Sequence, residues 1–170
     1  MSKTSLFIGR FQPFHKGHLS VVEAALKEND FLIIGIGSAE NNYLPENPFT
    51  AGERWEMITL ALDEAKISRD QYTIIPVRNI NNYALWVDHV AKIVPPFELV
   101  YTGSKIVKTL FEDHGKYPIH DVDMTLDVSA TRIRESILND GDWESHISPA
   151  VARYLKTINA VHRLKQIQTF

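Results

Sequence analysis

The chain has 170 residues, a formal net charge of −3 and no cysteine, and it is 44% hydrophobic and 23% charged. These proportions are typical of a globular protein, and the lack of cysteine excludes disulfide bonds, thiolate metal sites and cysteine nucleophiles. The mildly acidic balance gives no general reason to expect nucleic-acid binding, and the apolar runs are too short for a signal peptide or for the roughly 20 residues of a membrane span. We therefore expect a single soluble, cytoplasmic domain over residues 1–170.

Strand and helix patterns alternate from the start of the chain. Residues 6–8 are apolar and end at Gly9, and residues 16–29 then place apolar side chains at helical spacing. Residues 31–37 form a continuous apolar run, which is typical of a parallel strand covered on both faces. Residues 50–53 fit a capping box, which predicts that a further helix begins there.

The alternation continues through the middle of the chain. Residues 72–77 form a strand candidate, residues 84–94 a helix that two prolines end, and residues 97–101 a strand that stops before Gly103. This β-α-β-α-β-α-β order predicts an α/β fold with an open, doubly wound, mostly parallel sheet of the Rossmann-like type and right-handed crossovers. Residues 145–170 are expected to form a small helical C-terminal extension.

Ligands of such a sheet bind beyond the carboxyl ends of the strands. We therefore expect the chemistry in the segments that leave these ends. Those segments are residues 9–18, residues 37–48, residues 79–83 and Gly103.

The first motif lies between the first expected strand and the first expected helix. His15 and His18 stand three residues apart and can share one face of a helical turn. The free N–H groups of a helix start attract phosphate, and Gly17 lacks the Cβ that would block its approach. Because imidazole titrates near neutrality, either ring could donate a proton to a phosphate oxygen. A metal site, for which the spacing supplies no third ligand, and a structural pair are the alternatives.

The second motif lies late in the chain, where residues 127–134 indicate a strand end that passes into a helix. Ser129 suits the N-cap position, and a simple helix start is the alternative interpretation. Two hydroxyls, the free N–H groups of a helix start and two arginines are also what a polyphosphate requires. Arg132 and Arg134 are two residues apart and cannot share a helix face, so at most one of them points into a site there.

With these two motifs, H-x-G-H and S-x-T-x-x-R, the chain resembles the nucleotidylyltransferase superfamily. Further segments resemble the archaeal type of nicotinamide-nucleotide adenylyltransferase; they are residues 9–15, 37–39, 47–54, 84–87, 140–143 and 158–159. The resemblance implies that ATP and nicotinamide mononucleotide (NMN) give NAD and pyrophosphate, with Mg²⁺ accompanying ATP. The 5′-phosphate of NMN would attack the α-phosphorus of ATP in line, so no protein nucleophile is needed.

The resemblance also implies roles for individual residues. The catalytic residues would be His15, His18 and Arg134. The ATP-binding residues would be Gly9, Arg10, Phe11, Gly17, Gly103, Ser129 and Thr131. The NMN-binding residues would be Ser38, Ile80 and Trp86, with the Trp86 indole stacked on the nicotinamide ring. No protein metal site, nucleic-acid partner or membrane partner is implied. The expected assembly is a homo-oligomer, and a hexamer is expected because archaeal-type relatives tend to be hexameric.

Two residues depart from the family pattern. Glu46 stands where relatives often carry an arginine, so either its loop faces solvent or ATP binding is weaker or differently arranged. Tyr83 stands where an asparagine is expected near the tryptophan. The alternatives are a nucleotidylyltransferase for another acceptor (phosphopantetheine, FMN or glycerol phosphate), a non-catalytic nucleotide sensor and, last, a metal-binding regulator.

Overall fold

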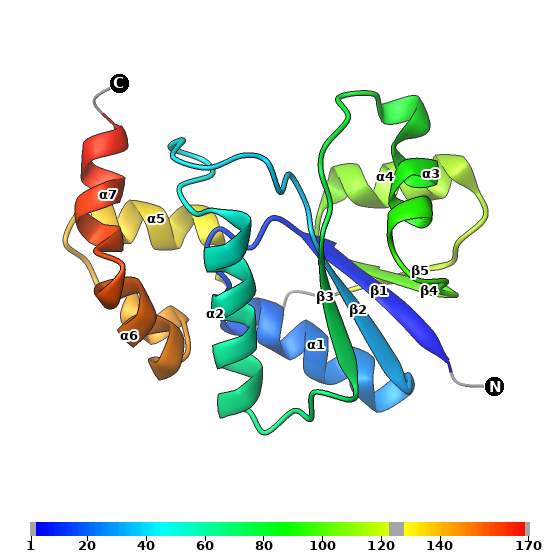
Figure 1. Ribbon diagram of the computed structural model, residues 1–170, viewed down its shortest axis with the longest axis horizontal. Helices are drawn as coiled ribbons and strands as arrows, with labels where there is room; N and C mark the ends of the chain where they lie inside the picture. The colour runs from blue at the N-terminus through cyan, green and yellow to red at the C-terminus, as the bar shows by residue number, and fades with distance from the viewer. Residues whose placement is uncertain (1–2, 123–127, 169–170) are drawn as a thin grey trace.

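The computed structural model describes residues 3–122 and 128–168. Within these residues five strands form one parallel sheet in the order β3-β2-β1-β4-β5, so β1 lies at its centre (Figure 1). The predicted open, parallel, Rossmann-like sheet is confirmed. The strands are β1 (Thr4–Gly9), β2 (Phe31–Ile36), β3 (Tyr72–Pro76), β4 (Leu99–Thr102) and β5 (Ile119–Asp121).

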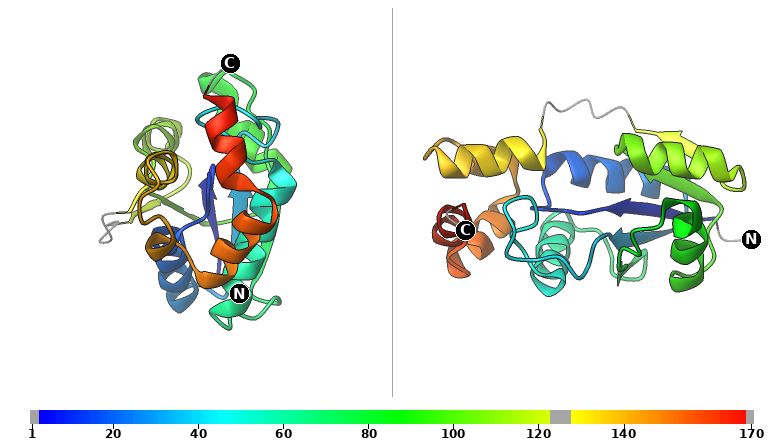
Figure 2. Two further views of the ribbon diagram at one scale, coloured as in Figure 1. Left: turned by 90° about the vertical axis from the view of Figure 1, so that its left-hand side faces the viewer. Right: turned by 90° about the horizontal axis from the view of Figure 1, so that it is seen from above.

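The helices cover both faces of this sheet and extend beyond the carboxyl end of β1 (Figure 2). They are α1 (Lys16–Glu28), α2 (Ala51–Glu64), α3 (Tyr83–Ile93), α4 (Lys105–His114), α5 (Ala130–Leu138), α6 (Pro149–Thr157) and α7 (Ala160–Ile167), with a short 3-10 turn at Glu144–His146. Among the helices described, none has the length and hydropathy needed to cross a bilayer.

The alternation of side chains along β1 separates two apolar clusters. Phe7 belongs to a cluster with the buried faces of α1, α2 and α5–α7, whereas Leu6 and Ile8 belong to a cluster with α3 and α4. Successive strand residues point to opposite faces of a sheet, so the two clusters lie on its two sides. Both clusters contribute residues with no exposed surface, such as Leu164 of α7. The C-terminal helices are thus packed into the larger cluster.

The capping box predicted at the start of α2 is confirmed and serves a second purpose. The Thr50 hydroxyl accepts a hydrogen bond from the Glu53 N–H (3.1 Å), and the Glu53 carboxylate accepts one from the Thr50 N–H (2.9 Å). Both carboxylate oxygens of Glu53 also accept 2.7 Å hydrogen bonds from the guanidinium of Arg163 on α7. One carboxylate therefore caps α2 and attaches the last helix to it.

Two described elements, α4 and β5, have no counterpart in the sequence prediction. The residues that cap α4 could have predicted this helix from the sequence. The Ser104 hydroxyl accepts a hydrogen bond from the Val107 N–H (3.5 Å), and Gly115 has φ +72°, the left-handed backbone that favours glycine after a helix. The sequence also predicts a strand end just before α5. Asp127 of that segment lies outside the described residues, and Val128 is not in a strand.

Candidate functional site

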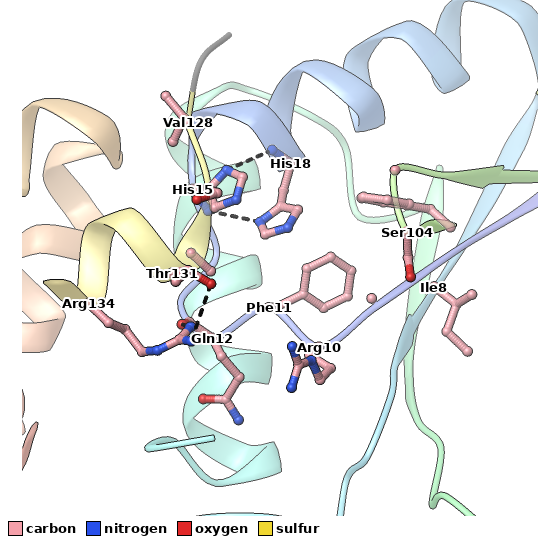
Figure 3. Close-up of a pocket in the computed structure, with 15 residues that line it drawn as sticks. Ile8, Arg10, Phe11, Gln12, His15, His18, Ser104, Val128, Thr131 and Arg134 are labelled. Atoms are coloured by element: carbon pink, nitrogen blue, oxygen red, sulfur yellow. Dashed lines mark hydrogen bonds between the residues drawn. The ribbon is translucent and has the colours of Figure 1, made fainter. Parts of the chain in front are cut away.

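A cavity of about 280 Å³ lies at the carboxyl ends of β1 and β4 (Figure 3). Its walls come from the end of β1, the loop that leads to α1, the start of α4 and the start of α5. The two sequence motifs, which lie far apart along the chain, therefore share one cavity. The lining residues are Phe7, Ile8, Gly9, Arg10, Phe11, Gln12, His15, His18, Gly103, Ser104, Val128, Ser129, Ala130, Thr131 and Arg134.

The structure brings most of the sequence-derived candidates together in this cavity. The candidates that line it are His15, His18, Arg134, Gly9, Arg10, Phe11, Gly103, Ser129 and Thr131. Gly17 does not line it and is buried in the first turn of α1. The three mononucleotide candidates also lie outside the lining: Ser38 follows β2, Ile80 follows β3, and Trp86 is in α3.

The backbone after β1 turns sharply into the cavity. Phe11 has a left-handed backbone (φ 53°), which is unusual for a bulky residue, and its ring is 1% exposed. A Cβ added to Gly9 would lie 3.0 Å from Cε1 of Phe11, so a larger residue at the end of β1 would push against this buried ring. The ring of Phe11 meets the ring of His18 edge-on, with 4.9 Å between centroids. The turn thereby supports one side of the His18 imidazole.

The two histidines cap α1 with each other. His15 is the N-cap residue, and its Nδ1 accepts a hydrogen bond from the His18 N–H (3.3 Å), while Nδ1 of His18 accepts one from the His15 N–H (3.2 Å). The rings stack with centroids 3.5 Å apart. Because each Nδ1 is an acceptor, each neutral ring carries its hydrogen on Nε2. The pair therefore presents two Nε2–H donors at the cavity wall.

Burial keeps both imidazoles uncharged. It lowers the pKa of His15 from 6.5 to about 4, with the nearby His146 as a smaller cause. Burial also lowers the pKa of His18 well below 6.5, and the charge of His15 lowers it further. The expectation that these rings titrate near neutrality is therefore wrong for this structure, because desolvation disfavours the charged form. At pH 7 both act as neutral hydrogen-bond donors.

A second wall is the start of α5, which lies beside His15 (Figure 3). The Ser129 hydroxyl accepts from the Arg132 N–H (3.2 Å) and caps the helix. Arg134 is 8% exposed and lines the cavity, where its guanidinium donates to the Gln12 carbonyl (2.8 Å) and the Thr131 hydroxyl (3.5 Å). Burial lowers the pKa of Arg134, with Arg10 as the next cause. Of the two arginines, Arg134 is the one in this cavity, and Arg132 is exposed outside it.

Sequence reasoning missed Gln12, whose side chain joins two loops. The amide is 1% exposed, donates to the Phe49 carbonyl (3.0 Å) and accepts from the Phe49 N–H (2.9 Å). It therefore pairs with the backbone before α2 as a strand residue would. No motif signals this role, because an isolated glutamine in a loop is usually exposed.

Glu46 lies beside Arg10, one of the lining residues. Its carboxylate lies 3.9 Å from the guanidinium of Arg10, and the two side chains are 79% and 52% exposed. Among the residues that the structure describes, no carboxylate lines the cavity, and no group of three or more histidine, aspartate or glutamate side chains could hold a metal ion. The described part of the cavity therefore offers a metal ion no carboxylate ligand.

Comparison with known proteins gives one consistent result. Residues 6–136 match the family described as cytidylyltransferase-like. Curated relatives named nicotinamide-nucleotide adenylyltransferase include that of Pyrococcus furiosus, which is 42% identical over 169 residues and covers 98% of this chain and 90% of the relative. That of Archaeoglobus fulgidus is 44% identical over 168 residues and covers 96% of each chain.

Solved structures agree with these relatives. A bifunctional NMN adenylyltransferase/ADP-ribose pyrophosphatase from Francisella tularensis, complexed with AMP and a manganese ion, has a TM-score of 0.79 and 27% identity. The match covers 98% of this chain but spans only about half, 52%, of that one. A structure from Vibrio parahaemolyticus with a TM-score of 0.68, at 17% identity, covers 92% of this chain and shares the fold.

The burial of the imidazoles predicts that acid destabilises the protein. The unfolded chain takes up a proton on His15 below pH 6.5, whereas the folded protein resists this uptake until about pH 4. The free energy of unfolding should therefore fall as the pH decreases through this window, by about 3 kcal/mol for His15 alone. Urea unfolding followed by circular dichroism at pH 7, 6, 5 and 4 measures this loss.

In the His15→Gln variant the dependence on pH should be visibly weaker, because the buried titrating ring is gone. The matched control is His162→Gln, which changes an exposed histidine of α7 and should keep the wild-type dependence. Equal slopes in wild-type protein and His15→Gln would contradict the assignment of a buried, neutral imidazole.

Proposed function

The chain belongs to the cytidylyltransferase-like family, and from that premise we propose that it is an adenylyltransferase which joins ATP and NMN to give NAD and pyrophosphate. The observation that carries the proposal is the convergence of His15, His18 and Arg134 on one cavity at the carboxyl edge of the sheet. Relatives with about 40% identity over nearly the whole chain are named for this activity.

The cavity supplies what this reaction needs. A 5′-phosphate oxygen of NMN forms a bond to the α-phosphorus of ATP, and the bond from that phosphorus to the β-phosphate breaks, so the electron pair leaves with pyrophosphate. No protein nucleophile or general base takes part. Catalysis then consists of holding the two substrates in line and stabilising the charge that moves to the leaving group.

The histidines and Arg134 are proposed to divide this task. The Nε2–H groups of His15 and His18 donate to phosphate oxygens without the cost of burying two further charges. The guanidinium of Arg134 supplies the fixed positive charge for the β- and γ-phosphates, which become the pyrophosphate. The Ser129 and Thr131 hydroxyls line the same wall, and the free N–H groups of the α5 start add donors there. Gly9 and Gly103 leave room for adenosine.

A divalent metal ion is proposed to arrive with ATP, and we take Mg²⁺ as that ion. The related Francisella tularensis structure contains a manganese ion beside AMP. No carboxylate of the described residues lines the cavity, so these residues do not form a protein cage for it. When bound, the ion would neutralise part of the triphosphate charge, and its ligands would be phosphate oxygens and water.

NMN is proposed to lie over the loops that follow β2 and β3, near Ser38, Ile80 and Trp86. The first loop adjoins the cavity, because the Gly37 N–H donates to the Gly9 carbonyl (2.8 Å). Trp86 is only 9% exposed and its ring packs edge-on against Phe111 of α4. Stacking on nicotinamide would therefore involve the small uncovered part of the indole.

Assembly and location are part of the same proposal. Four large apolar side chains are exposed on α3 and α4: Tyr83 (62%), Leu85 (56%), Ile93 (41%) and Ile106 (51%). Such side chains favour a contact between copies, so we propose a homo-oligomer, with the hexamer as the form to test. Residues 1–170 would act as one cytoplasmic domain in each copy.

The direct test offers the purified protein ATP, Mg²⁺ and one acceptor at a time. NMN should give NAD and pyrophosphate, whereas phosphopantetheine, FMN and glycerol phosphate should give no pyrophosphate. A parallel reaction with nicotinate mononucleotide compares the acid with the amide. Tight ATP binding with no pyrophosphate from any acceptor would contradict the proposal and favour a nucleotide sensor.

His18→Ala should reduce kcat by about a hundredfold, because one donor to the developing charge is lost. Steady-state NAD formation measures the effect, after circular dichroism has shown that the variant is folded. His162→Ala removes an exposed histidine of α7 and should retain the wild-type kcat. A kcat for His18→Ala within threefold of wild type would refute the role proposed for this ring.

Glu46→Gln should lower the KM for ATP by about two- to fivefold, because it removes a negative charge beside Arg10, which lines the cavity. The effect should be largest at low ionic strength, where exposed charges are least screened. Glu98→Gln, which neutralises an exposed carboxylate just before β4, is the control. An unchanged or higher KM in Glu46→Gln would show that this carboxylate does not compete with the triphosphate.

A further inference from the structure

Arg54 on α2 has no exposed surface, yet neither the motifs nor the proposed chemistry gives it a role. A buried guanidinium is costly unless all its donors are satisfied. The donors of Arg54 are not satisfied by an ion pair, since no carboxylate of the described residues forms one with it. Its partners are backbone carbonyls.

These carbonyls come from three segments of the chain. Nη1 donates to the carbonyls of Arg10 and Gly37, both at 2.9 Å. Nη2 donates to the carbonyl of Ser38 (3.1 Å) and, at longer distances, to those of Ala39 (3.5 Å) and Asn41 (3.4 Å). Nε donates to the Thr50 carbonyl (3.2 Å) at the start of its own helix. The planar, five-donor guanidinium is the side chain that can satisfy such a set.

Two of the segments are the ones that would hold the two substrates. Arg10 belongs to the β1–α1 loop, which lines the cavity proposed for ATP. Residues 37–41 begin the β2–α2 loop, which includes Ser38, a residue with left-handed backbone (φ 47°). At the strand ends the Gly37 N–H donates to the Gly9 carbonyl, and at the far end of the second loop Gln12 pairs with Phe49. Arg54 connects the two loops between these points.

The connection extends to a third loop. The carboxylate of Glu40 accepts hydrogen bonds from the Asn79 N–H at 3.1 and 3.2 Å, and the Ala39 N–H donates to the Val77 carbonyl (3.1 Å). Residues 77–82 lead into α3, which carries Trp86. The carbonyls that Arg54 holds are therefore part of a continuous layer of backbone at the carboxyl edge of the sheet.

Arg54 keeps its charge in this environment. Burial lowers the pKa of Arg54 to about 10, and the charge of Glu40 partly offsets this effect, so the guanidinium is protonated at pH 7. If the side chain only filled space, an apolar residue of similar size would serve α2 with less desolvation cost. An apolar residue could not donate hydrogen bonds to the carbonyls of separate loops, as Arg54 does.

We propose that Arg54 is a positioning residue that fixes the ATP-binding loop after β1 relative to the mononucleotide-binding loop after β2. It thereby sets the separation and alignment of the two reacting phosphates without touching either substrate. This inference rests on the proposed function. Reactions that depend on in-line geometry lose about two orders of magnitude in rate when the partners are displaced by roughly 1 Å.

The test is Arg54→Lys, which keeps the positive charge but has only three donors on one nitrogen. The kcat for NAD formation should fall at least tenfold. The Kd values of ATP with Mg²⁺ and of NMN, each measured alone by calorimetry, should change less than threefold, because each loop can still bind its own substrate. A kcat within threefold of wild type would overturn the inference, and so would an unchanged kcat with a tenfold weaker Kd.

The matched control is Leu164→Ala, which removes a fully buried side chain of α7 that belongs to the core and not to either loop. It should lower the Tm and leave kcat within threefold of wild type at temperatures where it is folded. If Arg54→Lys does not fold, Arg54→Gln is measured in the same way. Failure of both variants to fold would overturn the inference in favour of a purely structural role.

A second readout does not depend on the activity. Hydrogen exchange at the amides of residues 37–41 should be at least tenfold faster in Arg54→Lys than in wild-type protein, with exchange in β2 unchanged. The two readouts test the proposed function and the role of Arg54 separately. Wild-type protein that makes no NAD refutes the proposed function, whereas unchanged exchange at these amides refutes the role of Arg54.

Discussion

The rest of the structure depends on the parallel pairing of β1 with both β2 and β4. Parallel strands deliver all their carboxyl ends to one edge of a sheet, so the loops that follow them must share a small volume. Here β1 is central, and its loop lies between the one after β2 and the turn at Gly103 after β4. The cavity is the space that these crowded loops leave open.

Crowding also buries backbone N–H and C=O groups of these loops, which lie beyond the strands and have no partner in the sheet. These groups need other hydrogen-bond partners. Three buried side chains satisfy several of these groups in place of further secondary structure. Gln12 pairs with Phe49, Arg134 donates to the Gln12 carbonyl, and Arg54 donates to carbonyls of the loops after β1 and β2. Each of these residues is buried and polar. The shape of the site is thus held by side chains whose hydrogen bonds would otherwise go to water.

Much of the fold is predictable because apolar periodicity is a local property. The patterns of residues 16–29 and 31–37 indicated α1 and β2, and the capping box at Thr50 indicated the start of α2. The three-residue strand β5, at the edge of the sheet, is too short to show a period, and it was missed. In the site, the motifs indicated which side chains bear chemistry. They could not reveal Gln12 or Arg54, because burial of a polar side chain depends on segments that are distant in sequence.

The mutual cap of His15 and His18 has a consequence for how the protein responds to its surroundings. The Nδ1 atoms that cap the start of α1 belong to the same rings that offer Nε2–H at the cavity wall. A proton taken up on either Nδ1 converts an acceptor into a donor that faces another N–H. The N-terminal cap of α1 and the donors at the cavity wall therefore depend on the same tautomer, so a change in the protonation of either ring alters both together.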